Sequence, residues 1–298
     1  MSCLRGHGYQ RLVLQVVGIA GAVMFELDEL KIYRGGDIQI TPKITITQPT
    51  LGQIEEFGEK RYFSAVHTLT AVGADLKWQL WDMAQIDYTT IEDYELFIQY
   101  IWMAVSSKKR IYKELIDNAE EHADELASLS KETLDEMLVN PLGLVLKNID
   151  FADFMPCKHE GTGEVILYNA ERDIVIDRIA YRQIVDAVRK IHGFKRNNEK
   201  PANEATKMIL IDDARDDAMA NANKPYKSIL KPLISALAVK CGMCGDGRIW
   251  NMHINEFFDA IKRTSKIQNA ELLLQGAYSG FASLKGVDKS LLEWAGDL

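Results

Sequence analysis

The chain has 298 residues, a length typical of about two domains and sufficient for a sizeable hydrophobic core. Its 47% hydrophobic and 26% charged residues are ordinary for a globular protein, which excludes disordered, collagen-like and many-span membrane proteins. Lys and Arg total 35 against 43 Asp and Glu, and the resulting net charge of -8 argues against a broad nucleic-acid surface. Four cysteines are too few for a secreted disulfide framework, so we expect an intracellular protein.

Residues 1–23 conflict with that expectation. Arg5 and Arg11 precede an uncharged run, and Ala20-Gly21-Ala22 has the form of a signal-peptidase site. We favour a translated leader ahead of a true start at Met24, because a charged and well-patterned segment begins immediately after it. A signal peptide, or an anchor or packed helix, stays open, although the run is short for a bilayer.

The next segment predicts a β-hairpin followed by a helix. Residues 27–47 alternate in polarity on either side of a turn at residues 34–37, with Pro42 marking an edge position or a bulge. Thr50 and Gln53 have capping-box spacing, which predicts a helix over about residues 50–70. Gly58 would cost that helix about 1 kcal/mol relative to alanine.

Two further helices, over residues 75–83 and 91–105, follow in an aromatic-rich region that we expect in the core. Thr89 and Glu92 have the spacing to open the second of them.

Residues 107–139 differ in character, because nine acids follow four basic residues and the apolar stripe is narrow. This pattern indicates an exposed acidic helical arm. We favour a solvated face on an outer helix; the alternative is a docking helix for a basic partner or another subunit. The candidate partner-binding residues are Leu115, Glu120, Glu121, Asp124 and Glu125.

The periodicity changes near residue 140, which predicts one subdomain over residues 24–140 and a second over residues 141–298. Short strands are expected over residues 151–158, 165–168 and 174–176. Helices are expected over residues 180–191, 203–220, 226–239, 254–278 and 291–294, with a break near Pro232. The predicted fold class is α+β, mainly helical, with an N-terminal β-hairpin and a small central antiparallel sheet.

The motif Cys241-Gly242-Met243-Cys244 has chemical potential, since a C-x-x-C turn can bind zinc or form a redox pair. Cys157 and His159 could complete a tetrahedral zinc site with Cys241 and Cys244. The half-sites are more than eighty residues apart in sequence, so we favour ordinary reduced cysteines and expect no metal or cofactor.

Two charge clusters have both a functional and a structural interpretation. Four acids that share one helical face could hold Mg²⁺, although a solvated face neutralised by Lys207 and Arg215 is favoured; they are Asp212, Asp213, Asp216 and Asp217. A basic cluster could contact phosphate, although complementing the dipole of its helix is favoured; it comprises Arg189, Lys190, His192, Lys195, Arg196 and Lys200. Nucleophile-elbow, Walker-A and G-x-G-x-x-G motifs are absent from the sequence, so we expect no enzyme.

The run Gln48-Pro49-Thr50-Leu51-Gly52-Gln53-Ile54 and its continuation through Phe57–Phe63 and His67–Ala71 resemble proteins from the morphogenesis region of tailed bacteriophages and prophages of Gram-positive gut bacteria. Residues 201–207, 223–228 and 292–298 strengthen the resemblance, which covers most of residues 25–298. It lapses over about residues 107–145 and at Cys241 to Cys244, and it leaves residues 1–23 without a counterpart.

The hairpin that leads through the P-T-L-G-x-I turn into a helix looks like the opening of tail assembly chaperones, which hold the tape-measure protein during tail building. The resemblance therefore implies a non-enzymatic assembly protein in the host cytoplasm, with phage tail proteins as partners. A structural virion component and a metal-dependent enzyme are the alternatives. We expect neither nucleic acid nor a membrane among the partners, and self-association stays open.

Overall fold

The computed structural model describes residues 28–296 apart from residues 160, 246 and 282, so the interpretations of residues 1–23 lie outside it. The described chain is 57% helical and contains two small antiparallel sheets of three strands each. The predicted fold class is therefore confirmed: the protein is α+β and mainly helical, with an N-terminal hairpin and a second small sheet.

The N-terminal hairpin consists of β1 (Ile38–Thr41) and β2 (Ile44–Ile46), and β3 (Leu146–Lys147) pairs with β2 as the third strand. The predicted hairpin over residues 27–47 was wrong in its first half, where α1 (Glu29–Tyr33) forms a short helix. The Asp28 carboxylate accepts a hydrogen bond from the Lys31 amide and so caps this helix. Pro42 lies in the two-residue turn of the hairpin.

The capping box of Thr50 and Gln53 is confirmed and opens α2 (Leu51–Phe57). The predicted single helix over residues 50–70 was wrong, because α2 ends at Gly58 and α3 (Glu59–Thr70) begins there in a new direction. Gly58 has a φ of 99°, which residues with a side chain rarely adopt.

A 3₁₀ turn, η1 (Gly73–Asp75), leads to α4 (Lys77–Ala84) and then to α5 (Asp93–Leu96). The π-helical turn η2 (Phe97–Ile101) joins α5 to α6 (Trp102–Asp117). Thr89 does not open α5 as predicted, because its amide and hydroxyl both donate to the Asp87 carboxylate within a turn. Most of the aromatic side chains in this region are buried, as expected.

Next come α7 (Ala123–Ser128), α8 (Lys131–Leu138) and a 3₁₀ turn, η3 (Phe151–Asp153). Both α8 and η3 pack against α6. The predicted central sheet is confirmed, with the order β4-β5-β6 from β4 (Met155–Lys158), β5 (Val165–Asn169) and β6 (Ile174–Ile176).

Helix α9 (Arg178–His192) runs through the centre of the body and packs against both α3 and β1. It is amphipathic, and its buried face carries eight of its fifteen residues. Asp177 caps its N-terminus, and Gly193 ends it in the left-handed region. The helix predicted over residues 180–191 is confirmed, and it begins two residues earlier than expected.

The C-terminal part contains α10 (Glu204–Asn221), α11 (Leu230–Lys240), α12 (Ile254–Tyr278) and two 3₁₀ turns, η4 (Arg248–Asn251) and η5 (Lys289–Leu291). Pro232 lies in the first turn of α11 and does not break it, because first-turn amides need no intrahelical partner. None of the helices in the described residues is both long and apolar enough to cross a membrane.

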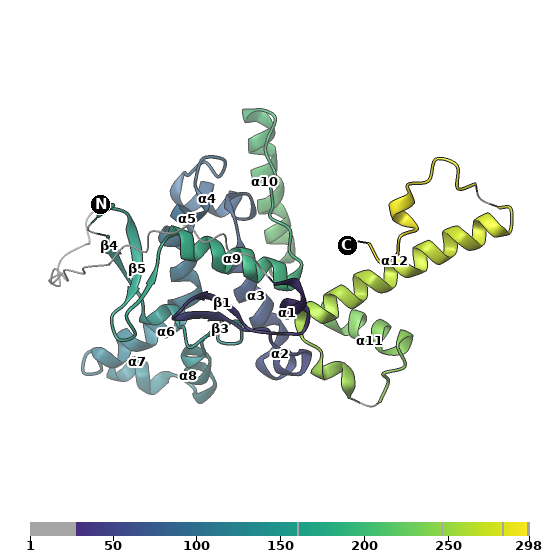
Figure 1. The fold of residues 1–298 in the computed structure, drawn as a ribbon. Helices are drawn as coiled ribbons and strands as arrows, with labels where there is room; N and C mark the ends of the chain where they lie inside the picture. The colour runs from purple at the N-terminus through teal and green to yellow at the C-terminus, as the bar shows by residue number, and fades with distance from the viewer. Residues whose placement is uncertain (1–27, 160, 246, 282, 297–298) are drawn as a thin grey trace.

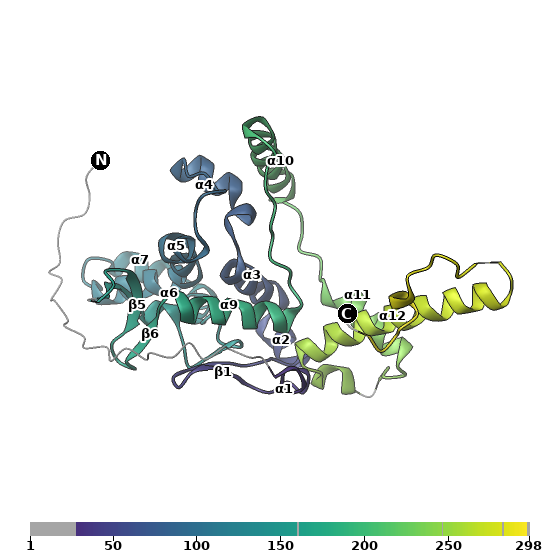
Figure 2. The same cartoon turned by 45° about the horizontal axis from the view of Figure 1, so that its top comes forward.

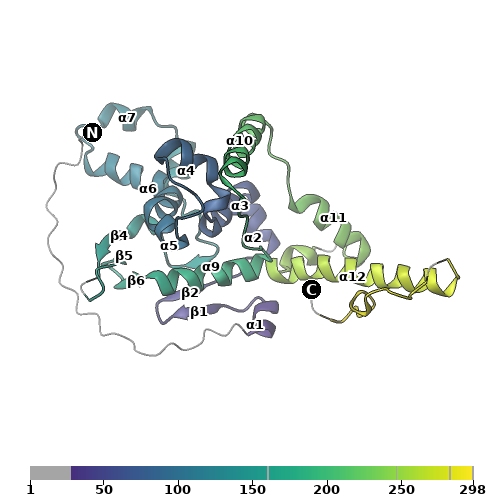
Figure 3. The same cartoon turned by 90° about the horizontal axis from the view of Figure 1, so that it is seen from above.

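Helix α10 and the outer part of α12 project from the body, as Figures 1, 2 and 3 show from three directions. The buried core draws on residues before and after position 140. Contacts between β2 and β3 and between α3 and α9 cross that position. The predicted division into two subdomains near residue 140 stays a prediction.

Candidate binding groove

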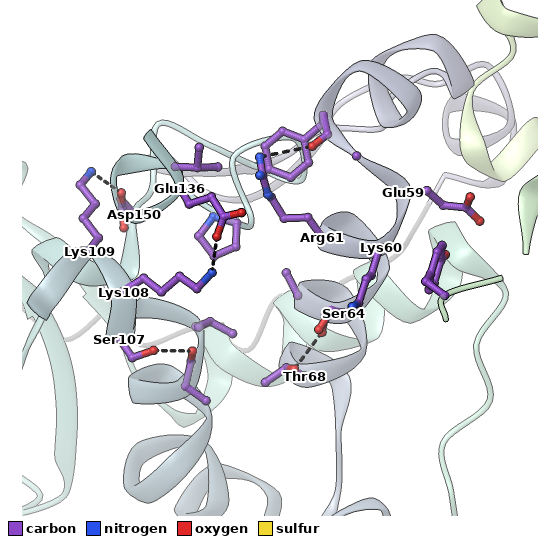
Figure 4. A pocket seen from close by; sticks show the side chains of 18 residues that line it. Glu59, Lys60, Arg61, Ser64, Thr68, Ser107, Lys108, Lys109, Glu136 and Asp150 are labelled. Atoms are coloured by element: carbon purple, nitrogen blue, oxygen red, sulfur yellow. Dashed lines mark hydrogen bonds and ion pairs between the residues drawn. The ribbon is translucent and has the colours of Figure 1, made fainter. Parts of the chain in front are cut away.

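A groove of about 750 Å³ opens between α3, α6 and the segment that follows α8 (Figure 4). Its wall combines apolar side chains with Lys, Arg, Glu and Asp side chains. The apolar lining includes Phe57, Ala65, Val105, Val139 and Pro141, and Tyr226 also lines the groove. A cavity of this size and mixed lining is typical of a binding site.

Helix α3 supplies two cations to the groove. The turn at Gly58 places Lys60 and Arg61 at the start of this helix, where both line the wall. The Arg61 guanidinium lies 5.5 Å from the centroid of the Phe57 ring and donates to the Phe57 carbonyl at 3.4 Å. The cation–π contact holds Arg61 against the wall without neutralising its charge.

Two further lysines, both on α6, are paired with carboxylates. Lys108 Nζ lies 2.9 Å from the Glu136 carboxylate of α8, and Lys109 Nζ lies 2.5 Å from the Asp150 carboxylate. The hydrogen bond from Lys108 lowers the pKa of Glu136, and the charges of Lys108 and Arg61 lower it further. These pairs fasten α8 and the chain before η3 to α6.

The carboxylate of Glu59 points away from the Lys108–Glu136 pair and accepts hydrogen bonds at the start of α11 (Figure 4). It accepts hydrogen bonds from the Ile229 amide at 2.7 Å and the Leu230 amide at 2.8 Å. Burial opposes its ionisation, but hydrogen bonds from Ser228, the two amides and Tyr226 together outweigh burial and lower the pKa of Glu59. Glu59 thereby fixes the first turn of α11 beside the groove.

The wall therefore carries an excess of positive charge. Each of its carboxylates is engaged, by Lys108, by Lys109 or by the α11 amides. Within the described residues, neither Lys60 nor Arg61 lies within ion-pair distance of a carboxylate. In a chain of net charge -8, this groove is suited to an acidic ligand with apolar side chains.

Of the residues predicted to bind a partner, the three whose side chains are described, Leu115, Glu120 and Glu121, do not line the groove. Leu115 is only 6% exposed, because α6 packs against α8 and η3, so it is not the surface residue that the apolar stripe indicated. Glu120 and Glu121 are exposed between α6 and α7. The side chains of Asp124 and Glu125 lie outside what the structure describes. That these acids bind a partner stays a prediction.

The four zinc candidates are not brought together. Cys157 lies on β4 and His159 directly follows that strand, whereas Cys241 and Cys244 are exposed at the end of α11, far from that sheet (Figure 1). His159 instead accepts hydrogen bonds from the backbone of its own turn. In the part of the chain that the structure describes, no group of three or more His, Cys, Asp or Glu is placed to hold a metal ion.

The acidic face of α10 is clamped to α4 by Arg215. Its guanidinium donates to both Asp82 oxygens, at 2.6 and 2.7 Å, and to Asp212 at 2.6 Å. The hydrogen bonds to the two carboxylates raise the pKa of Arg215. Lys207, expected to neutralise the same acids, pairs with Asp87 and Glu204. Asp213, Asp216 and Asp217 are exposed.

Members of the predicted basic cluster join separate elements. Arg189 donates to the Thr70 carbonyl at 2.6 Å, Lys190 pairs with Glu29 at 2.7 Å, and Arg196 makes a bidentate contact with Asp93. His192 is buried. These contacts go beyond the helix-dipole role that we favoured from the sequence.

Sequence reasoning missed the groove because its walls come from segments around residues 57–68, 104–109, 136–150 and 226. The basic pair Lys60-Arg61 after a glycine was the available signal. Comparison of the chain with models of protein families, with curated proteins and with solved structures finds no match.

Proposed function

We propose that the chain is a non-enzymatic assembly protein of a phage tail, acting in the host cytoplasm, and that its groove holds a segment of the tape-measure protein. The resemblance around residues 48–71 supports the assembly role. The groove between α3, α6 and α8 supports binding of a protein segment, since helical segments commonly lay an apolar face into such grooves.

The observation that carries this proposal is the pair of cations Lys60 and Arg61, which have no carboxylate within ion-pair distance among the described residues. They recognise carboxylates on the bound segment, while Phe57, Val139 and Pro141 contact its apolar side chains. Charge then speeds association, and apolar contact sets how long the complex lasts.

The test is capture of the tape-measure protein of the same phage by the full chain, at low and high salt. The double variant Lys60→Glu and Arg61→Glu should weaken capture by at least about tenfold at low salt, where screening is least, and less at high salt. Its matched control is Lys195→Glu with Lys200→Glu, which changes the net charge equally at exposed positions away from the groove. Equal capture by both double variants would contradict the groove as the binding site.

A structural virion component is the second candidate, on the same resemblance. Mass spectrometry of purified virions distinguishes it from a chaperone, which should be absent from finished particles. Leu115→Asp is unsuitable for testing the acidic arm, because a buried charge would unfold the packing of α6 whatever the arm binds.

A further inference from the structure

The two ion pairs of the groove differ in how easily their side chains can exchange partners. The side chains of Lys109 and Asp150 are only 25% and 12% exposed, so breaking this pair would leave two charges in a largely buried position. The side chains of Lys108 and Glu136 are 67% and 55% exposed. Because exposed ion pairs contribute little to stability, the Lys108–Glu136 pair can open at little cost. Of the two pairs, this one is suited to exchange with a ligand.

Glu136 extends from α8 into the part of the groove where the cations lie (Figure 4). Its carboxylate is 2.9 Å from Lys108 Nζ. The hydrogen bond and the charge of Lys108, together with the charge of Arg61, lower the pKa of Glu136, so both cations stabilise a carboxylate at this point. The position beside these cations is therefore already occupied by a carboxylate of the chain itself.

Helix α8 need not move for this carboxylate to leave Lys108. Met137, the next residue, is buried, and α8 packs against α6. Since the Glu136 side chain is exposed, a change of its rotamer is enough to release Lys108. Lys108 would then join Lys60 and Arg61 as a groove cation that has no carboxylate partner among the described residues.

We propose that Glu136 competes with the carboxylates of the bound segment for Lys108, so that the chain limits its own affinity for acidic ligands. This inference rests on the proposed function, because it concerns the same groove and the same class of ligand. An isolated carboxylate gains little from the exchange, since it forms the contact that Glu136 gives up. A ligand with an apolar face also gains the contacts with the groove wall, so the competition selects acidic segments that are amphipathic.

Binding of a fluorescein-labelled synthetic helix to the full chain, measured by fluorescence anisotropy, tests the competition. The helix has about 18 residues, with glutamates on one face and leucines on the other, which is the chemistry of the proposed ligand. Glu136→Gln should lower its dissociation constant about three- to fivefold at low salt and less at high salt, because the competing carboxylate is removed. The matched control is Asp135→Asn, which makes the same charge change at an exposed neighbouring position that does not line the groove, and it should leave the constant unchanged.

The gain in affinity should depend on Lys108. Glu136→Gln combined with Lys108→Gln should bind the synthetic helix no more tightly than the unsubstituted chain does. The Tm of Glu136→Gln should stay within a few degrees of that of the unsubstituted chain, because the pair is exposed. An equal dissociation constant in Glu136→Gln and Asp135→Asn, or a gain that persists without Lys108, would overturn the inference. So would a synthetic helix that binds none of these chains.

These outcomes are distinguishable from failure of the proposed function. If the synthetic helix gives the expected pattern but the tape-measure protein is not captured, the competition is supported and the tape-measure protein is not the ligand. If capture of the tape-measure protein is weakened by Lys60→Glu with Arg61→Glu but is indifferent to Glu136→Gln, the groove is supported as the binding site and the competition is overturned.

Discussion

Tyr62 and His192 form a buried polar pair at the centre of the core. The histidine Nδ1–H donates to the Val188 carbonyl at 2.7 Å, since a carbonyl can only accept. Nε2 is then free to accept the Tyr62 hydroxyl at 2.6 Å. Burial lowers the pKa of His192 to about 4, despite the opposing hydrogen bond to Val188. The ring is therefore neutral at pH 7 and pins α3 to the last turn of α9.

This pair makes stability depend on pH. The pKa of His192 is 6.5 in the unfolded chain and about 4 in the folded chain. The contribution of the neutral ring to the free energy of unfolding is therefore fully present above pH 6.5, and it is lost as the pH falls toward 4. Between pH 7 and pH 5 the free energy of unfolding should fall by on the order of 2 kcal/mol more in the unsubstituted protein than in His192→Gln, which cannot titrate. Urea unfolding of both proteins at both pH values measures this difference. An equal fall in the free energy of unfolding in the two proteins would contradict a neutral buried His192.

The same pair shows what a sequence can indicate about single residues. His192 could be assigned from its neighbours to a basic cluster, but not to the core, because its partner lies 130 positions earlier. The capping box of Thr50 and Gln53 was identified correctly, because capping depends on groups within four residues. Capping interactions between neighbouring residues can be predicted from sequence, whereas a buried contact between distant residues cannot.

Among the elements, the break between α2 and α3 was missed because glycine inside a periodic pattern is compatible with either a continuous helix or a turn. The short helix α1 was missed because only two apolar residues supported the alternation. Helices with a long periodic pattern were predicted more accurately, and α12 has the predicted bounds of residues 254–278.

Replacing Gly58 with alanine distinguishes the two interpretations by the sign of its effect. A continuous helix would gain about 1 kcal/mol from the substitution. At a φ of 99° we expect a loss of about 1–2 kcal/mol, because a side chain is strained in this conformation. This strain is local to the backbone and involves no clash with more distant residues, since beyond the adjacent residues the nearest atom to an added Cβ is Arg61 Cβ at 4.0 Å. Thermal unfolding of Gly58→Ala measures it, and a rise in Tm would show that the chain can continue as one helix.

For the whole molecule, the groove illustrates why sites are harder to predict than elements. Its walls form only when α3, α6 and α8 pack together, and no local sequence pattern indicates that these segments lie side by side. Leu115 was expected on an exposed acidic arm, but it is buried, because α6 packs against α8 and η3.

The core also predicts how the protein divides on truncation. Before residue 140 lie β1, β2 and α3, and their partners β3 and α9 lie after it. A fragment of residues 24–140 would expose the edge of β2 that pairs with β3 and the face of α3 that packs on α9. We therefore expect it to lack a cooperative thermal transition, because too little apolar surface remains buried.

A matched truncation removes a different part of the chain. Residues 24–262 keep Ile254 and Phe257, which lie in the first turn of α12. They lose the outer part of α12, which has Ala270 as its single buried residue, together with the C-terminal segment whose η5 packs on it. This shorter chain should retain a cooperative transition with a Tm within a few degrees of that of the full chain. A cooperative transition in the 24–140 fragment would instead establish an independent domain that ends near residue 140. Differential scanning calorimetry of the three chains separates these outcomes, because the enthalpy of each transition reports how much of the core remains folded.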